Sequence, residues 1–257
     1  MNDYDVLKNY EQSVILSDNK PWIIKLALPD TFTRDFSAAN DRFIMTCLLD
    51  VTKYICERIP EARLGYIFGG TIILVLNPEN AQTQRLQELL SSICSSVTLH
   101  FNVIWNNYIK KYIQSNKLTV KQLTSEEYKD IRPYITHNMH ATFVGRCFEL
   151  DSIEDLQVYL TVNQRLWFSQ AIDKVWIANF LTKPATAMSD TDKLKVFEDS
   201  QIDFYGLGTK FYKGQTVFKT NRKTEDGNTQ SVWIDYAAPS FRANKIFIDK
   251  IYHNMFI

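Results

Sequence analysis

Histidine and cysteine, the residues that most often bind transition metals, are few and scattered in this sequence. They are His100, His137, His140, His253, Cys47, Cys56, Cys94 and Cys147. Only His137 and His140 are close enough to suggest a shared ion, and no cysteine lies near them to complete a zinc site. The cysteines lie in apolar surroundings without the paired spacings of metal or disulfide frameworks. We therefore predict a surface loop for the histidine pair, buried thiols for the cysteines, and no metal site.

Lysines placed among aromatic residues are the best local candidates for contacts with phosphate groups or bases. Lys210-Phe211-Tyr212-Lys213 is followed by Lys219, Arg222 and Lys223. An ammonium group neutralises phosphate oxygens directly, and an aromatic ring provides a face for a base. We predict that Lys210 and Lys213 bind a nucleotide or phosphate. The alternative is a solvated hairpin whose aromatic residues lie in the core.

The overall composition limits the classes of function. Lysine plus arginine and aspartate plus glutamate each total 29, so any RNA contact must use local patches instead of a broad basic surface. Residues 1–16 contain no apolar run of the kind found in secretory signals. No stretch reaches the roughly 18 consecutive apolar residues of a membrane span. We predict a cytoplasmic protein without a membrane segment.

The first half of the sequence has the element order of a compact α+β fold. Residues 20–28 favour a strand, and residues 40–58 have apolar residues at helical spacing. Residues 64–76 predict a hairpin around a glycine pair, residues 81–94 predict a second helix, and alternation over 97–103 predicts a further strand. This β-α-β-β-α-β order is the ferredoxin-like pattern on which nucleotidyltransferase palms are built.

The second half begins after a polar, charged stretch. We predict a palm-like core over 1–109, an insertion or linker over 110–142, and a C-terminal part over 143–257 that completes the fold. The elements predicted after the linker are a strand over 143–150, helices over 152–180 and 190–197, a basic hairpin strand over 210–219, and an aromatic-rich tail over 231–257.

Several short motifs occur in a fixed order between residues 6 and 219. Asn40-Asp41-Arg42-Phe43 is similar to Pro-Asn-Asp-x-Arg-Phe, and Phe143-Val144-Gly145-Arg146-Cys147-Phe148 is similar to Phe-Asp-Ala-Arg-Val-Phe. Further matches lie at 6–11, 24–27, 31–34, 65–72, 162–164 and 210–216. Together they resemble the histidine-tRNA guanylyltransferases, which add nucleotides to RNA in the 3′-to-5′ direction. The resemblance implies a ferredoxin-like βαββαβ palm with a helical and β-hairpin C-terminal extension, nucleotide or tRNA as partner, and a homo-oligomer.

The sequence departs from this family where the family binds metal. Two divalent ions in such a palm need carboxylates on the first strand and on the central hairpin. The corresponding positions are Ala27 and Gly70, and the glutamate that follows in the family is Thr71. Asp30, Asp35 and Asp41 lie near the lost first aspartate but are typical of loop acids and of a helix start. We therefore predict no catalytic residues of the family type.

Other positions retain groups that suit a phosphate-bearing ligand. By resemblance, Lys25 occupies the position of a family arginine, Asn40 and Asp41 belong to a motif near the triphosphate, and Lys193 falls close to a phosphate-contacting lysine. With Lys210 and Lys213, these residues form the predicted nucleotide or phosphate site. Mg²⁺ and GTP are implied as cofactors only if the protein is an active enzyme.

Four interpretations remain open from the sequence. The first is a pseudoenzyme that binds a nucleotide, a nucleotide signal or tRNA. The second is an active tRNA 5′-end nucleotidyltransferase with relocated metal ligands. The third is a relative of diguanylate cyclases, because residues 68–73 also resemble their Gly-Gly-Asp-Glu-Phe hairpin. The fourth is a structural or interaction protein that uses the palm as a scaffold.

Overall fold

The computed structural model describes residues 20–29, 41–78, 86–117, 141–182, 187–223 and 229–255. The strands are β1 (Trp22–Ala27), β2 (Ala62–Phe68), β3 (Thr71–Leu76), β4 (Val144–Glu149), β5 (Gln215–Lys223) and β6 (Thr229–Ala237). The helices are α3 (Asp41–Cys56), α4 (Leu86–Ser115), α7 (Ile153–Phe180), α8 (Asp190–Asp199), the 3-10 turn η2 (Tyr205–Leu207), α9 (Thr209–Lys213) and α10 (Lys245–Tyr252).

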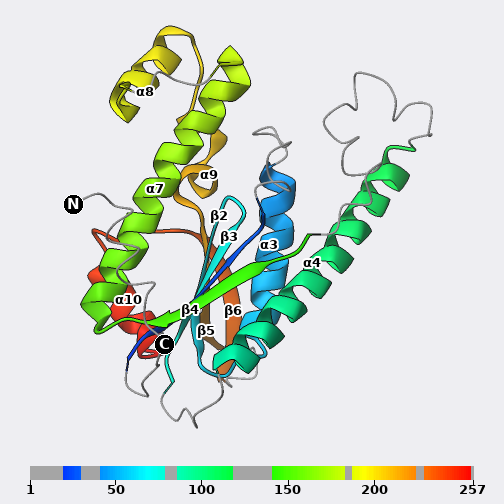
Figure 1. Cartoon of the computed structure of the whole chain (residues 1–257), viewed down its shortest axis with the longest axis vertical. Helices are drawn as coiled ribbons and strands as arrows, with labels where there is room; N and C mark the ends of the chain where they lie inside the picture. Colours follow the sequence, from blue (N-terminus) through cyan, green and yellow to red (C-terminus); the bar gives the residue numbers. More distant parts are fainter. Residues whose placement is uncertain are drawn as a thin grey trace.

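The strands form one antiparallel sheet in the order β4-β1-β3-β2-β5-β6 (Figure 1). The helix α3 connects β1 to β2, and α4 precedes β4, so the first four strands have the ferredoxin-like βαββαβ order. The β5–β6 hairpin widens this sheet, and α7, α8 and α10 complete the C-terminal extension. The predicted α+β class, with its hairpin over residues 64–76, is confirmed.

The strand predicted over 97–103 is wrong, because these residues lie inside α4, a helix of 30 residues. Val97 and Phe101 are buried, whereas Leu99 is 68% exposed and Val103 is 47% exposed. A helix explains this pattern because residues four positions apart share one face. In a strand, these four alternate residues would all lie on the same face, whereas two of them are buried and two are exposed. The strand that completes the palm is instead β4, which comes from the second half of the chain.

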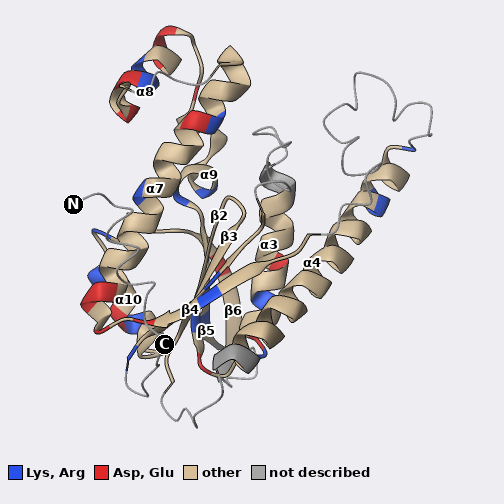
Figure 2. Cartoon of the chain, viewed as in Figure 1, with Lys and Arg blue, Asp and Glu red and all other residues tan. Residues whose placement is uncertain are grey.

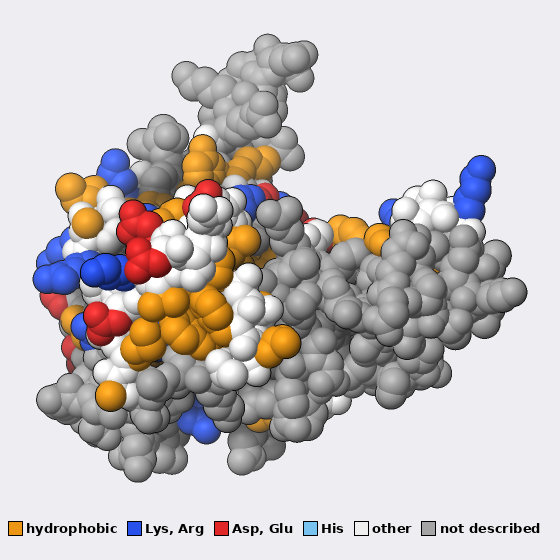
Figure 3. All heavy atoms as spheres, turned by 90° about the horizontal axis from the view of Figure 1, so that it is seen from above, with side chains coloured by type: hydrophobic (Ala, Val, Ile, Leu, Met, Phe, Trp, Pro, Cys, Tyr) orange, Lys and Arg blue, Asp and Glu red, His pale blue; other side chains and the backbone are white. Residues whose placement is uncertain are grey.

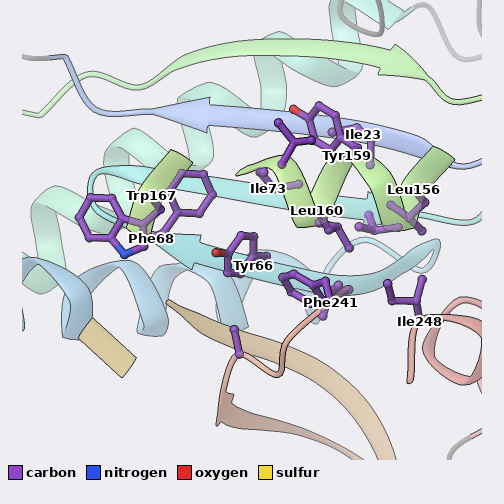
Figure 4. Close-up of a cluster of buried hydrophobic side chains, with 14 of the residues drawn as sticks. Ile23, Tyr66, Phe68, Ile73, Leu156, Tyr159, Leu160, Trp167, Phe241 and Ile248 are labelled. Carbon is purple, nitrogen blue, oxygen red and sulfur yellow. The ribbon is translucent and has the colours of Figure 1, made fainter. Parts of the chain in front are cut away.

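Helices cover both faces of the sheet. Ile24 and Leu74 belong to the hydrophobic cluster with α3 and α4, whereas Ile23 and Ile73 belong to the cluster with α7 and α10. Figure 1 shows these helices on either side of the strands, and Figure 4 shows α7 packed across them. Successive strand residues point to opposite faces, so strands covered on both sides are apolar at nearly every position.

The helices of the second half begin at polar side chains. The hydroxyl of Ser152, the N-cap of α7, accepts a hydrogen bond from the Asp155 backbone N–H. Ser189 and Asp192 form a capping box at the start of α8. These side chains satisfy backbone N–H groups that have no partner inside the helix, so they define where each helix starts. The predicted helices over 152–180 and 190–197 are confirmed.

The basic strand predicted over 210–219 is correct only from Gln215 onward. Lys210 and Lys213 lie on α9, a helix of five residues. Gly208 and Gly214 flank this helix with φ angles of 94° and 82°, in a region that residues other than glycine rarely adopt. These two glycines interrupt the extended chain, and β5 starts after the second one. The aromatic-rich tail supplies β6 and α10.

The predicted ranges 1–109 and 143–257 share the sheet, because β4 pairs with β1 and β5 pairs with β2. The helix α4 continues to Ser115, past the predicted start of the insertion at residue 110. Residues 118–140, most of that predicted insertion, lie outside the described residues. Among the described helices, none combines the length and the apolar character needed to cross a membrane.

Candidate functional site

Ala27, Gly70 and Thr71 lie together at one corner of the sheet. Ala27 is the direct partner of Thr71 in the pairing of β1 with β3, and the Leu28 N–H donates to the Gly70 carbonyl at 2.8 Å. The fold therefore brings these positions together as a two-metal site requires. A methyl group, a hydrogen and one hydroxyl cannot replace the carboxylates that hard divalent ions need. Neither β1 nor the β2–β3 hairpin contains a carboxylate, so the described residues of this corner do not fit two Mg²⁺ ions.

Trp167 of α7 packs against the turn at this corner. Gly69 has a φ of 51°, and a Cβ atom built on it would lie 2.7 Å from the Trp167 ring. The indole N–H of Trp167 donates to the Phe211 carbonyl at 2.8 Å, and Figure 4 shows the ring beside Phe68. Because any larger residue at position 69 would meet this ring, the turn and α7 are fitted to each other.

Two cations lie side by side next to this corner. Lys25 on β1 is the direct partner of Arg146 on β4, and it lies two residues before Ala27 on the same face of β1. Lys25 is half-buried and Arg146 is exposed, and Figure 2 shows basic positions on the strands near the middle of the sheet. Two cationic side chains on one face of the sheet can both contact the oxygens of a phosphate group, which makes the pair a candidate phosphate site.

Arg146 was not among the predicted site residues. It lies in the Phe143 to Phe148 motif quoted for the resemblance, but the motif alone does not say which strand it faces. What identifies Arg146 as a site candidate is the antiparallel register of β4 with β1, and this register is known only from the fold.

Several site residues predicted from the sequence lie outside the described residues, or have only their backbone described. Asn40, Asp30 and Asp35 are outside the described residues, as are His137 and His140. Asp41 is the first residue of α3, and only its backbone is described. These residues remain predictions.

Lys193 is held inside the protein by two carboxylates. Its side chain is 9% exposed, and its ammonium group lies 2.7 Å from Asp173 and 3.4 Å from Asp190. Burial acts to lower the pKa of Lys193, but the hydrogen bond to Asp173 and the charges of both carboxylates together raise it. The ammonium group therefore anchors α8 to α7.

Replacing Lys193 with methionine is expected to lower the free energy of unfolding by about 1–2 kcal/mol. The apolar stem keeps its volume, while Asp173 and Asp190 lose their counter-charge but remain partly solvated. Urea unfolding at neutral pH measures the change, with Lys195→Met on the exposed side of α8 as the matched control. Unchanged stability with weakened nucleotide binding would instead identify Lys193 as a ligand-binding residue.

Lys210 is part of a cluster of two lysines and one aspartate. Asp235 accepts from Lys53 at 2.6 Å and lies 3.4 Å from Lys210. The hydrogen bond from Lys53, with a further contribution from Lys210, lowers the pKa of Asp235. Figure 3 shows acidic and basic side chains mixed on the described surface of one face, as expected for equal numbers of the two.

Three side chains hold α9 at its C-terminal end. The Tyr66 hydroxyl donates to the Lys213 carbonyl at 2.9 Å, and the Gln164 amide donates to the same oxygen at 3.3 Å. Trp167 bonds the Phe211 carbonyl. A short helix leaves most of its carbonyl groups without partners in the helix, so these donors position α9 and its lysines.

The cysteines show no reactive environment. Cys47 and Cys56 are buried, Cys94 and Cys147 are half-buried, and all four are free thiols. Burial raises the pKa of Cys147 to about 12, which keeps it a neutral thiol. Within the described ranges, no group of three or more histidine, cysteine, aspartate or glutamate residues is arranged to hold a metal ion.

The ferredoxin-like sheet, its hairpin corner and α7 packed across it give the chain the fold of a palm domain. The sequence matches the family described as Thg1, tRNAHis guanylyltransferase, over residues 4–150, more than half of the chain. The chain belongs to this family. No curated protein sequence gives a significant match.

Solved structures of similar fold come from the same family. A bacterial tRNA(His) guanylyltransferase (Thg1)-like protein in complex with GTP matches with a TM-score of 0.67 and 18% identity, covering 97% of this chain and 98% of that chain. A structure of such a bacterial protein in complex with ATP matches with a TM-score of 0.68 and 19% identity, covering 98% of this chain and 100% of that chain. The tRNA(His) guanylyltransferase of Saccharomyces cerevisiae matches with a TM-score of 0.58 and 13% identity, covering 84% of this chain and 92% of that chain. At these identities the likeness establishes the fold.

Proposed function

We propose that this protein is a degenerate member of its family, which binds a nucleotide, a nucleotide signal or a tRNA end without two-metal nucleotidyl transfer. The observation that carries the proposal is a contrast at one corner of the sheet. Lys25 and Arg146 lie side by side next to Ala27 and Thr71. Cationic groups for phosphate are therefore retained where carboxylates for metal are missing.

The chemistry of each group supports binding without bond formation. Two divalent ions would clamp the attacking and leaving oxygens during transfer, and the described residues of the corner include no carboxylate to hold them. Lysine and arginine neutralise phosphate oxygens directly, and the guanidinium of Arg146 also orients them through paired N–H donors. The complexes of the bacterial relatives with GTP and ATP support a purine nucleoside triphosphate as the first ligand to test.

The proposal has two linked tests. In the first, labelled GTP is incubated with tRNA, Mg²⁺ and the protein, and we expect no incorporation above background. In the second, GTP binding is measured in EDTA at two salt concentrations. The double variant Lys25→Gln with Arg146→Gln is expected to weaken binding roughly tenfold or more, because each lost contact is a charged hydrogen bond. Binding by the wild type should also weaken as salt rises.

The matched control is Arg242→Gln with Lys250→Gln, which removes the same charge from exposed residues near the C-terminus. Metal-dependent incorporation of GTP would contradict the proposal and support an active nucleotidyltransferase with relocated ligands. If the wild type binds neither nucleotide nor tRNA, the protein is an interaction scaffold instead. Homo-oligomer formation and a cytoplasmic location remain expectations.

A further inference from the structure

The strand β6 forms one edge of the sheet, and β4, which contributes to the proposed phosphate site, forms the other. β6 has nine residues and pairs with β5 along its whole length without a shift in register. In the part of the chain that the structure describes, no strand lies beyond it. The outward N–H and C=O groups of such an edge strand can pair with another extended chain.

The two edges differ in the features that normally prevent this pairing. Natural edge strands are kept from pairing by short length, by lysine and other charged residues, by proline or by bulges. β4 has only six residues, and these include Arg146 and Glu149. β6 contains no lysine, arginine or proline, and its single charged residue, Asp235, already accepts from Lys53 at 2.6 Å. β6 is therefore long, regular and open to pairing.

One face of β6 offers apolar side chains to a neighbouring strand. Val232, Ile234 and Tyr236 follow one another on this face, because every second residue of a strand points to the same side. Ile234 pairs directly with Phe218, which belongs to the cluster with α7, and Tyr236 is 63% exposed. Pairs of β-branched and aromatic side chains on adjacent strands are favourable. An added strand should therefore carry apolar residues on this face.

The opposite face of β6 has an excess of positive charge. Trp233 and Asp235 lie on this face, and Lys219 on β5 is the direct partner of Trp233. The ammonium groups of Lys53 and Lys210 lie 2.6 Å and 3.4 Å from Asp235. Three lysines and one carboxylate leave a net positive charge beside the edge. Acidic residues on this face of an added strand would be attracted by that charge.

We infer that β6 binds an extended segment of a partner protein as an additional strand, and that apolar and acidic residues alternate in this segment. In such binding, main-chain hydrogen bonds provide affinity and the alternating side chains provide specificity. The site lies at the edge of the sheet farthest from β4 and does not involve Lys25 or Arg146. The inference therefore goes beyond the proposed function and does not depend on it.

The first test uses a fluorescent peptide, about as long as β6, in which valine and glutamate alternate. Its binding to the full chain is measured by fluorescence anisotropy, and two further peptides carry N-methyl groups on the valines only or on the glutamates only. Successive N–H groups of an added strand point alternately toward β6 and away from it. One methylated peptide should therefore bind at least about tenfold more weakly, while the other binds nearly as the parent peptide does.

The second test changes the protein. Tyr236→Glu places a charge on the apolar face and is expected to weaken binding of the parent peptide about tenfold. Leu99→Glu is the matched control, because Leu99 is 68% exposed on α4 and the change in charge is the same. Lys219→Gln is expected to weaken the peptide about two- to fivefold, and to have no effect on a peptide with glutamine in place of glutamate. Circular dichroism shows whether each variant is folded.

The inference is overturned if the wild type does not bind the parent peptide, if both methylated peptides bind as the parent does, or if Tyr236→Glu binds as Leu99→Glu does. It is also overturned if the wild type self-associates in sedimentation and Tyr236→Glu is monomeric, because a second copy then occupies the edge. Displacement of the peptide by single-stranded RNA would mean that the lysines bind nucleic acid, and would likewise reject it. Each of these results leaves the proposed function at Lys25 and Arg146 in place.

Discussion

Replacing Trp167 with alanine is expected to lower the free energy of unfolding by roughly 3–5 kcal/mol. The side chain is 4% exposed, lies 6.1 Å from Phe68 between ring centroids, and bonds the Phe211 carbonyl at 2.8 Å. Alanine removes the ring packing and the hydrogen bond, and it leaves a cavity beside the hairpin turn. Urea unfolding followed by far-ultraviolet circular dichroism is the suitable measurement, because the change also removes a fluorophore.

Trp167→Phe separates the two contributions. The smaller ring keeps most of the packing and loses only the donor to Phe211, so a cost of about 1–2 kcal/mol is expected. If Trp167→Ala lowers the free energy of unfolding by less than Trp167→Phe does, Trp167 does not hold α7 on the hairpin. The account of this corner would then be wrong.

Replacing Gly214 with alanine is expected to lower the free energy of unfolding by about 3 kcal/mol or more, because backbone strain and overpacking act together. Gly214 has a φ of 82° and a ψ of −173°, a region used almost only by glycine. A Cβ atom there would also lie 2.5 Å from the carbonyl oxygen of Ile67, and backbone in the middle of a sheet cannot move aside. The measurement is again chemical unfolding.

Gly208→Ala is a matched control for this clash. Gly208 has a φ of 94° and a ψ of 149°, so alanine meets comparable backbone strain, but no atom lies within 4 Å of its added Cβ. Its cost should be limited to about 1–3 kcal/mol. Equal costs for the two variants would show that β5 moves away from β2 to make room for the methyl group.

Elements with a strong local signal could be predicted from the sequence. The hairpin over 64–76 has apolar strands around a glycine pair, and α7 begins at Ser152, whose side chain bonds the helix start. In both cases the residues that determine the structure are neighbours in the chain. The resemblance added the meaning of the positions of Ala27 and Gly70.

Features that depend on distant partners could not be predicted. The sequence does not show that Leu99 and Val103 are exposed, because this depends on how α4 lies on the sheet. Likewise, Arg146 becomes a site candidate only through its register with Lys25, and Lys193 meets Asp173 only when α8 returns to α7.

The strand order also affects how the protein is made. Ile23 on β1 pairs with Phe148 on β4, and Leu64 on β2 pairs with Phe218 on β5, so the first three strands find their outer neighbours only late in synthesis. Until then, both edges of the nascent β1-β3-β2 sheet have unpaired backbone groups that can bind other chains. Such long-range pairing also costs loop entropy before contacts form, which slows folding. Chains released before β4 and β5 are complete should therefore aggregate instead of folding.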